Sequence, residues 1–291
     1  MILKWRLLIL LVVLVVVYCF KSSQLIINPP RFVSPYTPAD FGLDYKPLKL
    51  ITEDNLTIDA WFVPADSNSA PTIITCHGFN ADKGDCINMA RFLQPAGYNV
   101  LMFDFRGHGK SEGKYCSLGY HEYKDLSAAI SYLSEQKLTP IGAIGFSMGG
   151  TVALFAQAKN KKLTAVVSDG AYLSFSSAVI SFARRHYKVP KYPFIPPAIW
   201  TAALRLKFNP NRLNLVGLMP QISPRHCFII HGALDPEISP RDAHTLFDNA
   251  KEPKKLWIVE GARHCNSYDT AREEYEYQVI AFFNSYLKEK L

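Results

Sequence analysis

Ser147 is flanked by glycines in a pattern that is typical of a reactive serine. Ser147 is the centre of GFSMG (145–149), a G-x-S-x-G pattern that ends an apolar stretch and is followed by Gly150. A serine hydroxyl is a weak nucleophile unless it is exposed, oriented and next to a base. A sharp turn from a strand into a helix would expose it, and flanking glycines lack the Cβ atoms that would collide there. The pattern therefore predicts a nucleophile at a helix N-terminus, where free N–H groups favour negative charge.

The base and the acid that such a serine needs follow later in the chain. His264 would take the proton from Ser147 and return it to the leaving group, since histidine ordinarily titrates near neutral pH. Asp235 would hold the imidazole in the required tautomer and stabilise its charged form. Asp169 also ends an apolar stretch and is the alternative acid. We favour Asp235 because it follows the next predicted strand, in a loop that His231-Gly232 leads into.

Strands and helices must bring these distant residues together. From residue 46 onward, apolar strands alternate with amphipathic helices, a pattern typical of a mostly parallel sheet covered on both faces. The first two strands are expected to pair antiparallel around the Glu53-Asp54-Asn55 turn. The strands are expected at 46–51, 57–63, 72–78, 98–105, 140–146, 163–169, 227–232 and 254–260, and the helices at 83–95, 120–136, 148–159, 240–250 and 268–288.

A long segment, about 171–224, interrupts this alternation and shows no strand–helix pattern. It contains seven prolines, and an insertion of this length between two core strands is usually a cap over the carboxyl edge of the sheet. It has no Asp or Glu and seven basic residues, which equals the formal net charge of the whole chain, +7. The basic residues are Arg184, Arg185, Lys188, Lys191, Arg205, Lys207 and Arg212.

Composition limits the classes of function. The content of 48% apolar and 20% charged residues is that of a globular protein. The six cysteines show no C-x-x-C spacing, so we expect buried thiols or one or two disulfides, with no metal and no cofactor. Nucleic acid is not an expected partner, because the excess positive charge lies in one insertion and no nucleic-acid-binding motif is present.

The N-terminus is expected to be a membrane anchor. Leu7 to Phe20 form an uncharged run of fourteen residues, which matches the apolar core of a signal peptide but lacks an A-x-A-like cleavage site after it. We therefore predict an uncleaved signal anchor over residues 1–21 and a tether over 22–45. Lys4 and Arg6 precede the run, so we expect a single pass with the body of the protein outside the cytoplasm. A lipoprotein-type cysteine at Cys19 is the disfavoured alternative, because Tyr18 is too large for the preceding position.

Five segments together resemble the α/β-hydrolase superfamily, and the resemblance covers roughly residues 45–291. Beside the serine pattern these are HGFN (77–80), DFRGHGKSEG (104–113), HGALDPEISP (231–240) and VEGARHCN (259–266), in the family's order of serine, acid and histidine. The resemblance implies an α/β-hydrolase fold over 46–291 with a cap at about 171–224. It also implies an oxyanion hole from the backbone N–H groups of Phe79 and Met148. Within the superfamily, the chain is most similar to the membrane-anchored, serine-aminopeptidase-like and acylglycerol-lipase-like branch.

These observations predict a serine hydrolase that cleaves esters, thioesters or amides through an acyl-enzyme, with a carboxylesterase- or lipase-like activity on small or lipid-derived acyl substrates. Two alternatives stay open: a serine aminopeptidase of the same fold, which the absence of carboxylates in the cap disfavours, and a non-catalytic protein that binds a ligand. The basic, aromatic cap has two interpretations as well. It is an ordinary lid, or it rests on anionic lipid headgroups and makes the membrane a second partner.

Overall fold

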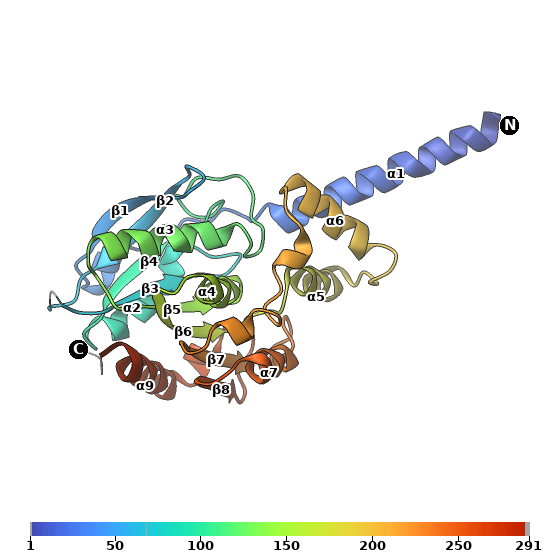
Figure 1. The fold of residues 1–291 in the computed structure, drawn as a ribbon. Helices are drawn as coiled ribbons and strands as arrows, with labels where there is room; N and C mark the ends of the chain where they lie inside the picture. The colour runs from blue at the N-terminus through green and yellow to red at the C-terminus, as the bar shows by residue number, and fades with distance from the viewer. Residues whose placement is uncertain (1, 68, 289–291) are drawn as a thin grey trace.

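An eight-stranded sheet organises the chain in the computed structural model, which describes residues 2–67 and 69–288. The strand order is β1-β2-β4-β3-β5-β6-β7-β8, with β1–β2 and β2–β4 antiparallel and every other pair parallel (Figure 1). The predicted mostly parallel α/β-hydrolase architecture is therefore confirmed. The strands are β1 (Lys46–Ile51), β2 (Thr57–Val63), β3 (Thr72–Cys76), β4 (Asn99–Phe103), β5 (Ile141–Phe146), β6 (Leu163–Asp169), β7 (His226–Gly232) and β8 (Lys254–Val259).

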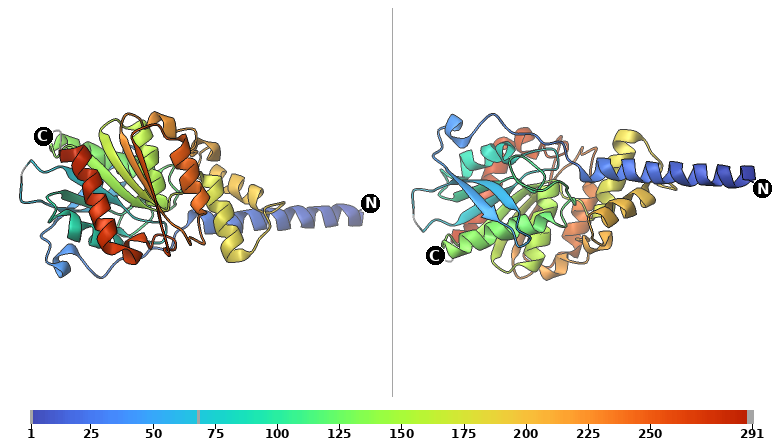
Figure 2. Two further views of the ribbon diagram at one scale, coloured as in Figure 1. Left: turned by 90° about the horizontal axis from the view of Figure 1, so that it is seen from below. Right: turned by 90° about the horizontal axis from the view of Figure 1, so that it is seen from above.

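Helices cover both faces of the sheet, and each face has its own hydrophobic cluster. Alternate residues of one strand belong to different clusters, as Ile73 and Ile74 of β3 do, because successive strand side chains point to opposite faces. On one face lie α3 (Glu122–Glu135), α4 (Met148–Lys159) and α7 (Pro240–Asn249); on the other lie α2 (Ile87–Leu93) and α9 (Arg272–Phe283). Figure 2 shows these layers from two further directions.

Two predicted helices are interrupted. The expected helix at 83–95 begins as a 3₁₀ turn, Lys83–Cys86, before α2. The expected helix at 268–288 is divided into α8 (Ser267–Thr270), α9 and a π-helical turn at Asn284–Lys288. At the first break, Asp82 caps the 3₁₀ turn by accepting a hydrogen bond from the Gly84 N–H, and Asp104 accepts hydrogen bonds from the Lys83 backbone N–H at 2.8 Å and from its Nζ at 2.6 Å.

The insertion contains two helices, although its sequence shows no strand–helix alternation. It contains α5 (Phe175–Tyr187) and α6 (Ile195–Arg205). Ser174 caps α5 by accepting a hydrogen bond from the N–H of Ser177. Pro196 and Pro197 occupy the first turn of α6, where a missing N–H costs nothing. Two of the seven prolines of the insertion therefore begin a helix.

The N-terminal helix α1 (Ile2–Ile27) is longer than the expected anchor, which was to end at residue 21. It extends away from the sheet at the end that carries α5 and α6 (Figures 1 and 2). Its residues Leu3–Ile27 are long and apolar enough to cross a membrane, as a membrane anchor or as a signal sequence. The expected tether after it is docked, since the guanidinium of Arg31 donates hydrogen bonds to the carbonyls of Gly109, Ser111 and Gly113.

All six cysteines are free, so the structure contains none of the disulfides that the sequence left open within the described residues. Five of them are buried, including Cys19 on α1, and Cys265 is partly buried. Burial raises the pKa of Cys86 and of Cys227 to about 12, so these two thiols are unreactive packing groups.

A buried ion pair fastens the loop after β3 to the carboxyl end of β4. Lys83 Nζ lies 2.6 Å from Asp104 and 2.7 Å from Asp59, and its side chain is only 2% exposed. We expect Lys83→Met to lower the free energy of unfolding by about 3–5 kcal/mol, because the buried charge of Asp104 would lose its cationic partner. Urea unfolding followed by circular dichroism measures this.

Lys49→Met is the matched control for that substitution. Lys49 also pairs with Asp59, but its side chain is 59% exposed, so its loss should cost less than about 1 kcal/mol. Equal costs for the two variants would contradict the importance that we assign to the buried pair.

Candidate active site

Ser147 lies at the turn between β5 and α4, as its sequence pattern predicts. Its backbone has φ 50° and ψ −111°, a strained conformation for a residue with a side chain. Its N–H donates a 2.8 Å hydrogen bond to the carbonyl of Asp169 at the end of β6, which holds the turn against the sheet. The strain is therefore maintained by a tight connection between two strand ends.

The flanking glycines are required by close backbone contacts. A Cβ on Gly145 would lie 2.3 Å from the carbonyl oxygen of Gly149, and a Cβ on Gly149 would lie 2.1 Å from that of Cys76. Both atoms that would be struck belong to the backbone, which cannot rotate away as a side chain can. The turn consequently depends on glycine at 145 and 149.

We expect Gly149→Ala to lower the free energy of unfolding by about 1–3 kcal/mol or more, because the added methyl group pushes α4 away from β3. The same shift should displace Ser147 and reduce any activity at this serine. Gly217→Ala is the matched control, since a Cβ there meets nothing within 4 Å. Thermal unfolding of both variants measures the difference, and a stable Gly149→Ala protein would contradict the close contact.

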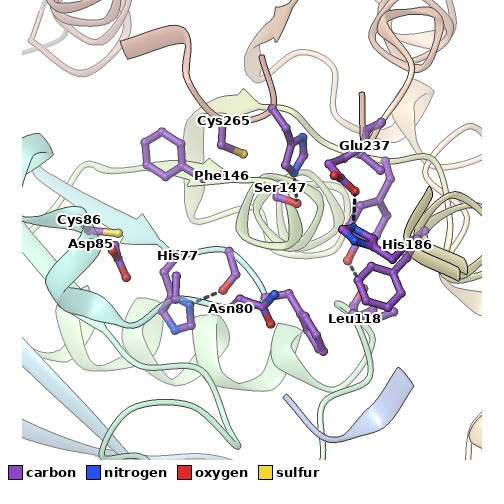
Figure 3. Close-up of a pocket in the computed structure, with 18 of the residues that line it drawn as sticks. His77, Asn80, Asp85, Cys86, Leu118, Phe146, Ser147, His186, Glu237 and Cys265 are labelled. Atoms are coloured by element: carbon purple, nitrogen blue, oxygen red, sulfur yellow. Dashed lines mark hydrogen bonds and ion pairs between the residues drawn. The ribbon is translucent and has the colours of Figure 1, made fainter. Parts of the chain in front are cut away.

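The structure brings Ser147, His264 and Asp235 together in one hydrogen-bonded series. His264 Nε2 lies 2.9 Å from Oγ of Ser147, which is labelled in the close-up of Figure 3, and His264 Nδ1 lies 2.7 Å from Asp235 Oδ2. Asp235 follows β7 and His264 follows β8. Residues separated by 117 positions meet because the carboxyl ends of parallel strands share one edge of the sheet.

Asp235 is a charged acceptor in a ring of donors. It accepts hydrogen bonds from the N–H groups of Glu237 at 2.8 Å and Ile238 at 2.9 Å, and from His231 at 3.1 Å. Burial alone would raise its pKa, but the hydrogen bonds from His231 and His264 hold the pKa well below its ordinary value. An ionised carboxylate only accepts, so Nδ1 of His264 carries the proton and Nε2 presents its lone pair to Ser147.

Asp169, the alternative acid, does not contact the imidazole. Its carboxylate accepts a 3.1 Å hydrogen bond from Ser267, and within the described residues its second oxygen has no hydrogen-bond partner. Burial raises the pKa of Asp169 to about 6. Asp169 stabilises the Ser147 turn through its backbone carbonyl, which accepts the hydrogen bond from the Ser147 N–H.

The N–H groups expected to form an oxyanion hole are free of protein acceptors. In the parts of the chain that the structure describes, neither the Phe79 N–H nor the Met148 N–H donates a hydrogen bond to another residue. Met148 begins α4, where the first N–H groups of a helix have no partner within it. Phe79 lines the same cavity as Ser147.

His77 orients the peptide that carries the Phe79 N–H, a role that sequence analysis missed. His77 Nε2 accepts a 2.9 Å hydrogen bond from the Phe105 N–H, so Nδ1 carries the proton and donates to the Gly78 carbonyl at 2.7 Å. Burial and the nearby His108 keep the pKa of His77 well below its ordinary value, so the ring is neutral. In a trans peptide the C=O and N–H point in opposite directions, so binding the Gly78 oxygen directs the Phe79 N–H.

His108 and His231 are also bound in the structure. His108 lies between the carbonyls of Arg106 at 2.9 Å and Phe79 at 2.6 Å. His231 donates toward Asp235 and the carbonyl of Ile238. The first therefore supports the loop that carries Phe79, and the second supports the acid.

Ser147 and His264 open into a cavity of about 660 Å³, within the range of small-molecule sites. Most of its wall is apolar and comes from α1, the loop after β3, α5 and the loops after β7 and β8. The apolar and aromatic lining residues include Leu25, Ile26, Phe79, Met89, Leu118, Phe146, Tyr172, Val179, Phe182, Ile238 and Tyr268.

Three carboxylates, Asp85, Glu237 and Asp269, reach this cavity from outside the cap, where sequence analysis did not look for them. Each is already engaged. Glu237 pairs with His186 of α5 at 2.9 Å, Asp85 accepts a 3.0 Å hydrogen bond from the Asp82 N–H, and Asp269 accepts one from Asn266 at 3.1 Å. Across the described residues, no cluster of His, Cys, Asp or Glu is arranged to hold a metal ion.

Known proteins resemble this chain in fold and in sequence. A family model described as alpha/beta hydrolase fold matches residues 71–192. The esterase Pf2001 of Pyrococcus furiosus superposes with a TM-score of 0.75 and 29% identity, covering 90% of this chain and 98% of that one.

Two curated relatives extend the comparison. The uncharacterized protein YqkD of Bacillus subtilis is 28% identical over 226 residues, which are 76% of this chain and 73% of that protein. The uncharacterized membrane protein YNL320W of Saccharomyces cerevisiae is 26% identical over 208 residues, covering 70% of this chain and 67% of that protein.

Proposed function

This chain belongs to the α/β hydrolases, and we propose that it is a serine esterase that acts through an acyl-enzyme formed on Ser147. The observation that carries the proposal is the series Ser147–His264–Asp235, with distances of 2.9 Å and 2.7 Å, at the floor of an apolar cavity. The likeness to an esterase over nearly the whole fold supports hydrolase activity in general.

In the first half of the reaction Ser147 Oγ attacks the carbonyl carbon of the ester. His264 Nε2 takes the hydroxyl proton as the new bond forms, and Asp235 stabilises the resulting imidazolium. The N–H groups of Phe79 and Met148 would receive the negative oxygen, with the Phe79 N–H oriented by His77. His264 then gives its proton to the departing alcohol, which leaves the acyl group on Ser147.

In the second half, water replaces the alcohol. His264 takes a proton from the water, which attacks the acyl carbon, and returns it to Ser147 Oγ as the acid departs. The same three side chains therefore serve both steps, and no cofactor is needed for the balance of atoms or charge.

The cavity favours an ester over a peptide with a free amino group. An aminopeptidase needs a carboxylate that is free to bind a substrate ammonium. Of the three carboxylates at this cavity, Glu237 is paired with Arg185 and His186 of the cap, and Asp85 and Asp269 are exposed to solvent, so none of them is a buried carboxylate without a partner. We therefore place ester hydrolysis ahead of aminopeptidase activity.

The proposal includes a membrane location. Support comes from the length and composition of α1 and from Lys4 and Arg6 ahead of its apolar run, which favour a single pass with the hydrolase domain outside the cytoplasm. The basic cap, beside α1, would face anionic headgroups. Protease digestion of sealed membrane vesicles whose cytoplasmic face points inward tests the orientation; full protection of the domain would contradict it.

A fluorophosphonate probe and a panel of esters, thioesters and amides test the function on the full chain in detergent. We expect covalent labelling at Ser147 and faster turnover of esters than of matched amides. Absence of labelling and turnover at every pH tested would overturn the proposal and favour a binding protein. Preferred release of N-terminal amino acids would favour the aminopeptidase instead.

A further inference from the structure

The last turn of α1 forms part of the cavity that contains Ser147. Leu25 and Ile26 line it together with Ser147 and His264, so a single space connects the N-terminal helix to the reactive serine. In Figure 3 the blue ribbon of the N-terminal segment passes beside the pocket. A helix whose first part is apolar enough for a membrane thus ends as a wall of the candidate active site.

Direct contacts fix α1 to the cap. Arg205 of α6 donates a 2.8 Å hydrogen bond to the hydroxyl of Ser23, which is fully buried, and its guanidinium lies 4.4 Å from the ring of Phe20. Tyr18 and Phe194 are in edge-to-face contact, with ring centroids 5.8 Å apart. These contacts between α1 and the cap therefore hold the last turn of α1, with Leu25, at the cavity.

The sequence of α1 places Leu25, a lining residue of the cavity, close to the end of the apolar run. The uncharged run ends at Phe20, and Lys21 follows it. At 1.5 Å per residue, Leu25 lies only about 6 Å along the helix from Lys21.

The outer surface of the cap has the composition of a membrane interface. Aromatic and basic side chains together are typical of the headgroup level. The large hydrophobic residues exposed there are Tyr187, Tyr192, Phe194, Trp200 and Leu204, and Lys188 and Lys191 lie among them in the sequence.

From these contacts we propose that the substrate is a membrane lipid ester, whose acyl chain passes from the bilayer between α1 and the cap and lies along Leu25 and Ile26. This inference rests on the proposed esterase function and specifies its substrate. The apolar wall suits an alkyl chain, and the polar groups at Ser147 and His264 suit the ester at its end. The anchor helix is then a substrate-positioning element as well as a membrane attachment.

Labelling with two alkyl fluorophosphonates tests this in vesicles that contain the full chain. The ethyl probe reports the reactivity of Ser147 alone, and the dodecyl probe reports the acyl path as well. We expect Leu25→Asp to lower the ratio of dodecyl to ethyl labelling rates by about tenfold or more, because a carboxylate would face the alkyl chain. Leu25 is 53% exposed, so the substitution should leave folding intact, and ethyl labelling verifies it.

Val33→Asp is the matched control, because Val33 is 49% exposed in the segment after α1 and lies outside the cavity lining. Its ratio should equal that of the wild type. An unchanged ratio in Leu25→Asp would overturn the inference while leaving the esterase proposal intact. Absence of labelling by both probes in the wild type would overturn the esterase proposal and this inference with it.

The route from the bilayer has its own measurement. An octadecyl probe is placed either in the same vesicles as the protein or in separate vesicles. Passage within the bilayer predicts much faster labelling in the shared vesicles. Equal rates would show that the probe reaches Ser147 through water and would overturn this route.

Discussion

Ser147→Ala is expected to lower kcat for ester hydrolysis by about 10⁶-fold, the loss typical of removing the nucleophile of a serine hydrolase. The Ser147 hydroxyl lies 2.9 Å from His264 Nε2. This ring nitrogen carries no proton, so it can accept the proton of the hydroxyl. Alanine keeps the Cβ, so the turn and the free energy of unfolding should stay unchanged. Initial rates with a short-chain ester and thermal unfolding measure both.

Cys265→Ala is the control for that substitution, because the thiol of Cys265 is another side chain at the same cavity that could act as a nucleophile. Burial raises the pKa of its thiol well above the ordinary value, so it is not a thiolate at neutral pH. We expect this variant to retain most of the activity. If Ser147→Ala kept its activity and Cys265→Ala lost it, the nucleophile would be the thiol.

Sequence alone was sufficient for the sheet and the serine turn because local rules govern both. The strands show as short apolar runs, and each observed strand lies within two residues at either end of its predicted range. The glycines at 145 and 149 were predicted from the need for close approach, which the backbone distances of 2.3 Å and 2.1 Å now explain. Chain order and strand ends also placed Asp235 and His264 at one edge.

The helices inside the cap and the end of α1 could not be predicted from local pattern. Pro196 and Pro197 usually disrupt a helix, and only their place in the first turn of α6 makes them compatible with one. Lys21 marked the end of the apolar run, but packing of Ser23 and Ile27, both fully buried, carries the helix to residue 27. These features depend on tertiary contacts between segments some 180 residues apart.

The supporting histidines show the same limit. His77 and His231 each precede a glycine after an apolar strand, which indicates a loop histidine and nothing more specific. Their roles became visible only when Gly78 and Asp235 were found as their partners. A residue type and a spacing can predict which groups react, whereas the groups that orient them are found through three-dimensional contacts.

Asp235→Asn is expected to lower kcat by about 10⁴-fold at neutral pH, with little change in KM. The carboxylate accepts from His264, His231 and two backbone N–H groups, whereas an amide has one accepting oxygen and a donating NH₂. An NH₂ group facing His264 would favour the tautomer with its proton on Nε2. That nitrogen could then no longer accept the proton of Ser147.

Asp169→Asn tests whether Asp169, rather than Asp235, is the acid of the series. The carboxyl of Asp169 accepts a hydrogen bond from Ser267 and none from His264 within the described residues, so an amide oxygen can replace it and kcat should stay nearly unchanged. Because burial raises the pKa of this acid from 3.8 to about 6, the folded state binds its proton more tightly than the unfolded state does. The wild type therefore loses stability relative to the variant as pH rises from 3.8 to about 6, and the difference persists above that. Urea unfolding at acidic and neutral pH measures this, and a loss of kcat as large as that of Asp235→Asn would assign the acid to Asp169.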